Sequence, residues 1–79
     1  MLSMIDKQIQ GVLTDSLGRR ARVRRKGRAQ AWRGVLGYHK DDTSYALRDG
    51  NIVLVTFTLG EVMPPFTATT DGMEITLVP

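Results

Sequence analysis

Short β-type runs that alternate with turn signals fill the chain from Arg19 to its end. Six such runs can be read from the alternation of apolar and polar residues and from their β-branched and aromatic content. They cover residues 19–25, 31–40, 45–48, 52–59, 66–70 and 73–78. Glycine, aspartate or proline stands between successive runs, as tight turns require. Since 79 residues can bury these runs only in one strongly bent sheet, we expect a small, mainly β domain.

Four positions in and between these runs carry more specific signals. Gly34 and Gly37 in the second run predict a bend or bulge. The nearly continuous apolar run 52–59 predicts a central strand that is largely buried. The adjacent prolines at 64–65 are expected to stop a hydrogen-bonded ladder, because proline has no backbone N–H. An Asp-Gly pair at 71–72 predicts a hairpin between the last two runs.

The segment before the first run has two interpretations. Its apolar residues recur at helical spacing over residues 3–17, Ser3 and Asp6 resemble a capping box, and Gly18 can end a helix. Against a helix, a glycine and a Thr-Asp-Ser triplet interrupt the pattern, which leaves a strand over residues 8–13 as the alternative. We favour the helix.

The stretches "ARVRRKG", "AWRGVLGYHKDDTSYALRDGN" and "IVLVTFTLGEV" resemble SH3-like small barrels of the Tudor and KOW kind. The resemblance spans residues 21–62. It implies an SH3-like β-barrel of five or six short antiparallel strands over residues 19–79, preceded by a helix or lead-in at 1–18. The two parts are expected to form a single domain. Many unrelated functions share such barrels, so the resemblance indicates a fold rather than an activity.

Two weaker resemblances concern families whose site motifs are absent here. "RVRRKG", "AWRG" and "GY" are similar to type II dihydrofolate reductases, but Val53-Leu54-Val55-Thr56 replaces that family's Val-Gln-Ile-Tyr strand. The chain is also similar to Sm-like RNA-binding barrels. Ser44-Tyr45 stands where that family has its asparagine, and Leu59-Gly60 where it has Arg-Gly. We therefore expect a protein that is not an enzyme and has no Sm-type base pocket.

The basic segment, residues 19–33, holds eight of the eleven Lys and Arg residues and no carboxylate. The rest of the chain has three cations against eight acids, a net charge of −5. Ala21 and Val23 alternate with arginines, so the arginines are expected to point to one face of a strand. Such a patch is typical of contact with a polyanion. The predicted nucleic-acid-binding residues are Arg20, Arg22, Arg24, Arg25, Lys26, Arg28, Trp32 and Arg33, with Trp32 as a stacking surface for a base.

Other interpretations of the basic segment stay open. It can dock on an acidic protein, as a regulator or inhibitor would, or form a solvated edge that hinders pairing between sheets or lies against a second copy. The sequence does not separate DNA from RNA.

Composition narrows the remaining possibilities. Without cysteine the chain has neither disulfides nor thiolate zinc sites, and with His39 as its one histidine we expect no metal and no cofactor. No apolar run reaches the roughly 20 residues of a membrane span, and the N-terminus does not resemble a secretory signal, so a cytoplasmic location is expected. A domain this small and without covalent staples often self-associates, which predicts a homo-oligomer.

Overall fold

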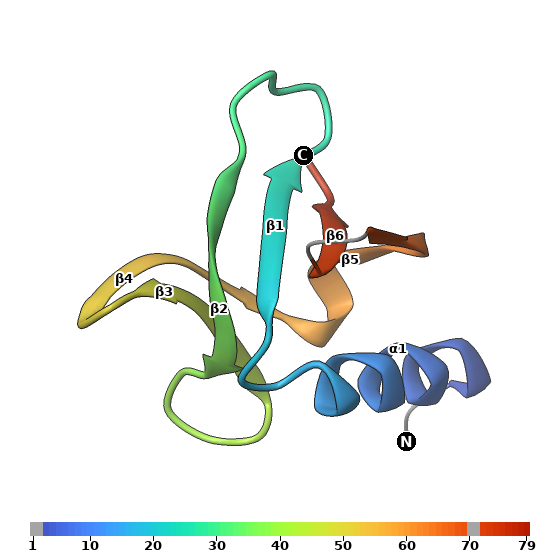
Figure 1. Cartoon of the computed structure of the whole chain (residues 1–79). Coiled ribbons are helices and arrows are strands. Elements are labelled where there is room, and N and C mark those ends of the chain that lie inside the picture. The colour runs from blue at the N-terminus through green and yellow to red at the C-terminus, as the bar shows by residue number, and fades with distance from the viewer. Residues whose placement is uncertain (1–2, 70–71) are drawn as a thin grey trace.

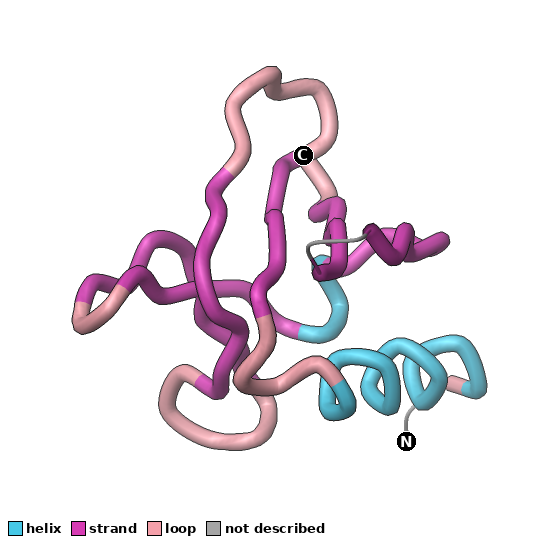
Figure 2. Tube along the Cα trace, in the orientation of Figure 1, coloured by secondary structure: helices cyan, strands magenta, loops and turns pink. Residues whose placement is uncertain are grey.

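The computed structural model describes residues 3–69 and 72–79, and for residues 64–69 it describes the backbone alone. The described chain is mainly β, with six strands and one α-helix (Figures 1 and 2). This confirms the expected fold class. The elements are α1 (Met4–Asp15), β1 (Arg20–Arg25), β2 (Trp32–Tyr38), β3 (Ser44–Asp49), β4 (Ile52–Thr58), the 3₁₀ turn η1 (Leu59–Glu61), β5 (Val62–Thr69) and β6 (Gly72–Leu77).

The six strands form one sheet in the order β4-β3-β2-β1-β6-β5. Neighbouring strands are antiparallel, with the exception of β1 and β6, which are parallel. The expectation of a wholly antiparallel sheet was therefore wrong at this pair. Strand direction is set by how the β5–β6 hairpin returns to β1, and residue alternation carries no information about it.

The sheet does not close into a barrel, because β4 and β5 lie at its opposite edges. In the described residues the expected barrel is thus open between β4 and β5. The β5–β6 register shifts between Met63 and Thr67, the stretch that contains the two prolines. Proline cannot donate to a ladder and is tolerated at a sheet edge, so the prolines suit β5 to an edge position. The predicted tip residue of this hairpin, Asp71, lies outside the described residues.

The N-terminal segment is helical, as the spacing of its apolar residues predicted. The Ser3 hydroxyl accepts a hydrogen bond from the Asp6 backbone N–H at 3.1 Å, which caps the first turn. Ile9 and Leu13 are buried in the core. Gly18 has a φ of +80°, a conformation that glycine adopts without strain, where the chain leaves the helix for β1. Figure 1 shows α1 at the end of the molecule opposite to the β1–β2 loop.

The apolar run that forms β4 is not central. The strand lies at an edge of the sheet, and 65% of Ile52 and 42% of Val53 are exposed. Phe57 is the one fully buried side chain of β4. The expectation of a central strand was wrong because an apolar run indicates burial but does not give the order of strands.

Aromatic rings on three neighbouring strands lie next to one another, and two of the three belong to the core. Tyr45 stacks on Phe57 with ring centroids 5.7 Å apart, and Tyr38 lies against Tyr45 at 5.6 Å. Tyr45 and Phe57 are buried, together with ten smaller apolar residues from α1 and the sheet. No helix in the described residues is long and apolar enough to cross a membrane.

The sequence predicted a bend or bulge at Gly34. In the structure, β2 and β3 come very close together at this residue. A Cβ atom at this position would collide with the backbone carbonyl of Arg48. The register of β3 against β4 also shifts at Arg48, which is a bulge on the other side of the same strand. Strand β3 therefore lies so close to β2 at this point that a side chain at position 34 has no room.

Candidate functional site

Three arginines of β1 share the outer face of the sheet. Ala21 and Val23 are buried, so the alternation along the strand directs Arg20, Arg22 and Arg24 away from the core. Successive members lie about 6.6 Å apart along the strand. This part of the predicted site is arranged as the sequence indicated.

Pairing between strands adds charges on both sides of Arg22. In the register, Arg22 is opposite Arg33 of β2 and opposite Glu74 of β6, so the three side chains form a row across three strands. Opposing side chains in a sheet have Cβ atoms roughly 5 Å apart, and like charges at such positions repel. The Arg22–Arg33 pair is therefore a place where a bound anion would relieve repulsion.

Arg48 of β3 belongs to the same face, although it lies outside the basic segment. It is opposite Val35, which is opposite Arg20. Its guanidinium donates a hydrogen bond of 2.8 Å to the Tyr38 carbonyl oxygen. Sequence reasoning missed Arg48 because it stands alone in "YALR", and the strand pairing that brings it to the cluster cannot be read from local charge density. We call Arg20, Arg22, Arg24, Arg33 and Arg48 the arginine face.

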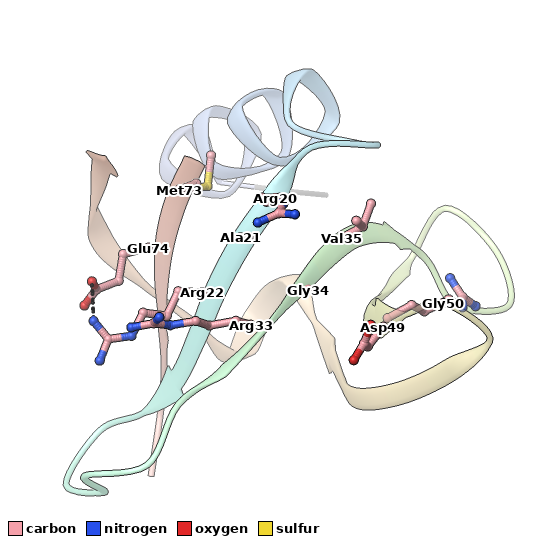
Figure 3. Close-up of a pocket in the computed structure, with 11 residues that line it drawn as sticks. Arg20, Ala21, Arg22, Arg33, Gly34, Val35, Asp49, Gly50, Met73 and Glu74 are labelled. Atoms are coloured by element: carbon pink, nitrogen blue, oxygen red, sulfur yellow. Dashed lines mark hydrogen bonds and ion pairs between the residues drawn. The ribbon is translucent and has the colours of Figure 1, made fainter. Parts of the chain in front are cut away.

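A pocket of about 570 Å³ opens on the arginine face, between β1, β2, β6 and the β3–β4 turn. Figure 3 shows Arg22 and Arg33 between two carboxylates, Glu74 on one side and Asp49 on the other. Four arginines and two acids thus line this arginine pocket. Its lining residues are Arg20, Ala21, Arg22, Arg33, Gly34, Val35, Arg48, Asp49, Gly50, Met73 and Glu74.

The arginines of the pocket are only partly committed to protein partners. Arg22 contacts Glu74 at 3.4 Å, a long contact between side chains that are 41% and 28% exposed. Pairs of this kind contribute about 0–1 kcal/mol to stability. Within residues 3–69 and 72–79, Arg20 and Arg33 have neither an ion pair nor a side-chain hydrogen bond. The face therefore presents donors that an anion can use.

Arg25 does not lie on the arginine face. Its guanidinium donates to a Glu61 carboxylate oxygen at 3.2 Å and to the Val78 carbonyl oxygen at 3.2 Å. The other Glu61 oxygen accepts the Thr58 backbone N–H at 3.0 Å. This hydrogen bond, with the charge and hydrogen bonds of Arg25, holds the pKa of Glu61 below its usual value of 4.5. Arg25 thus ties the end of β1 to η1 and to the C-terminal residues, which is a structural role.

The other predicted residues fall into two groups. Trp32 is partly buried and packs against the core, and it is opposite Val23 on the inner face. Lys26 and Arg28 are exposed in the loop between β1 and β2. Figure 1 shows that this loop forms one end of the molecule. The eight predicted residues therefore divide among the arginine face, the core side, the loop and the Arg25 contacts.

The arrangement suits the binding of anions. Guanidinium groups form paired, charge-assisted hydrogen bonds with phosphate or carboxylate oxygens. In the described part of the chain, no three His, Asp or Glu side chains gather as metal ligands would. No protein-family model, no curated protein and no solved structure matches the chain.

Proposed function

We propose that this protein is a small, non-enzymatic module of the cytoplasm that binds nucleic acid through its phosphates. The arginine face is the contact surface, and the exposed loop residues Lys26 and Arg28 extend it. The observation that supports this most is the convergence of five arginines from β1, β2 and β3 on one face of the sheet. Phosphate contacts dominate the affinity of such proteins.

The geometry of the arginine face favours contacts to the phosphate backbone of a nucleic acid over contacts to its bases. The arginines of β1 are spaced about 6.6 Å apart, similar to successive phosphates in an extended nucleotide chain. Trp32, the expected stacking residue, packs on the opposite side of the sheet. The binding is therefore expected to be tolerant of sequence. An acidic protein surface is the alternative partner, because carboxylates also bind guanidinium groups in pairs.

Titration of a labelled single strand and of a duplex at several salt concentrations tests the proposal. With four phosphates neutralised, the logarithm of the binding constant should fall against the logarithm of salt concentration with a slope of about −3 for the single strand and about −4 for the duplex. A double variant, Arg22→Ala with Arg33→Ala, should reduce the slope by about half. Lack of binding at about 50 mM salt, or an unchanged slope in the double variant, would contradict the proposal.

A further inference from the structure

The arginine pocket has a net positive charge. Four arginines and two carboxylates line it, which gives a formal charge of +2. A phosphodiester carries one negative charge, whereas a phosphate monoester carries about −1.5 to −2 at pH 7. Starting from the proposed function, on which this step rests, we propose that the pocket binds the terminal phosphate monoester of a nucleic-acid strand.

The shape of the site supports a chain end more than a chain interior. A volume of about 570 Å³ lies within the range of small-ligand pockets. The pocket lies on the face of β1, β2 and β6 beside the β3–β4 turn, and a terminal group placed there leaves the nucleic-acid chain to run away on one side only. Val35, which is 43% exposed and lies opposite Arg20 and Arg48, supplies an apolar surface beside the arginines, against which the sugar of the end nucleotide can pack.

Arg33 and Arg22 are the residues that hold the phosphate. Arg33 is exposed and has neither an ion pair nor a side-chain hydrogen bond within the described residues, so binding costs it no protein contact. Arg22 gives up only its long 3.4 Å contact with Glu74. The two are opposite each other across β1 and β2, so one phosphate can accept hydrogen bonds from both.

Glu74 sets the selectivity of the pocket. Its carboxylate already contacts Arg22, so it competes with the phosphate for this guanidinium group. A phosphodiester, with its single charge, displaces the Glu74 carboxylate from Arg22 less readily than a phosphate monoester does. Glu74→Gln is therefore expected to raise affinity for hydroxyl-ended strands and to narrow the difference between the two kinds of end.

The test compares three forms of one oligothymidylate that differ only in their ends, each labelled with a fluorophore on the same internal base. The 5′-phosphate, 3′-phosphate and hydroxyl forms are titrated at the same salt concentration and read by anisotropy. At least one phosphorylated form should bind about tenfold more tightly than the hydroxyl form, the effect of one added charge-assisted hydrogen bond. Equal binding by all three forms overturns the pocket proposal and leaves the backbone proposal standing. Binding by none contradicts both.

Two single variants locate the effect. Arg33→Ala removes a charge from the pocket, and Arg28→Ala removes the same charge from the exposed loop outside it. Arg33→Ala should abolish the preference for a phosphorylated end. Arg28→Ala should weaken the binding of all three oligothymidylates and keep the preference. A preference that survives Arg33→Ala, with unchanged melting temperature, places the end elsewhere and overturns the proposal.

Discussion

Arg25 and Arg33 belong to the same basic segment but have different roles, which the strand geometry explains. Arg25 reaches Glu61 and the Val78 carbonyl, while Arg33 has neither an ion pair nor a side-chain hydrogen bond in the described residues. Alternation along β1 predicted the shared direction of Arg20, Arg22 and Arg24. The role of Arg25 was not predictable, because its partner Glu61 is 36 residues away in the sequence.

Glu61 is expected to stabilise the fold in a way that depends on pH. Its pKa is lowered in the folded protein, chiefly by the Thr58 backbone N–H and then by Arg25. Its contribution is therefore fully present above pH 4.5 and is lost as the pH falls through the folded value. Glu61→Gln should lower the free energy of unfolding by about 1 kcal/mol at pH 7. Urea unfolding of both proteins between pH 7 and 3 measures this.

The difference between the wild type and Glu61→Gln should shrink below pH 4.5, where the wild-type carboxylate is increasingly protonated. A difference that grows toward acid pH would contradict the assigned role of Glu61.

Two glycines should respond in opposite ways to the same substitution. At Gly34 a Cβ atom would collide with the Arg48 backbone carbonyl, so Gly34→Ala should destabilise by about 1–3 kcal/mol. At Gly11, inside α1, a Cβ atom has open space, and Gly11→Ala should stabilise by about 0.5–1 kcal/mol. Thermal unfolding of the two variants decides. A neutral Gly34→Ala would mean that β2 and β3 do not approach as described.

At the scale of the elements, helix α1 was predictable and the place of β4 was not. The Ser3 cap and the helical spacing of Ile9 and Leu13 are local signals, and both are found in the expected role. The helix ends before Gly18, with Ser16 as its C-cap, and Gly18 takes its positive φ in the connection to β1. The run that forms β4 indicated burial, but the order of strands depends on pairing between distant segments. The sheet leaves Ile52 and Val53 exposed at the edge.

Two substitutions within β4 should therefore have unequal effects. Ile52→Thr changes a side chain that is 65% exposed, and it should alter the free energy of unfolding by less than about 0.5 kcal/mol. Phe57→Leu removes a buried ring that stacks on Tyr45, and it should cost about 1–3 kcal/mol. Chemical denaturation measures both values. Comparable losses at the two positions would support the central strand that the sequence suggested.

For the molecule as a whole, composition and patterning predicted the mainly β class, the six strands and the N-terminal helix. They did not predict the parallel pairing of β1 with β6 or the open edges of the sheet, since both arise from how distant hairpins meet. The same limit applies to the site. The arginines within β1 were predictable, whereas Arg48 and Glu74 join them only through strand pairing. The SH3-like likeness and self-association stay predictions.

Mapping of backbone amide shifts during titration with an oligonucleotide tests the central claim most directly, because it reports which surface meets the polyanion. The largest changes should fall in β1 and β2 around Arg22 and Arg33, and around Arg48 to Gly50 at the end of β3. Residues of α1 should change little, since none of them lines the arginine pocket. Changes confined to α1, or to Lys26 and Arg28 in the loop, would contradict the assignment of the arginine face as the binding surface.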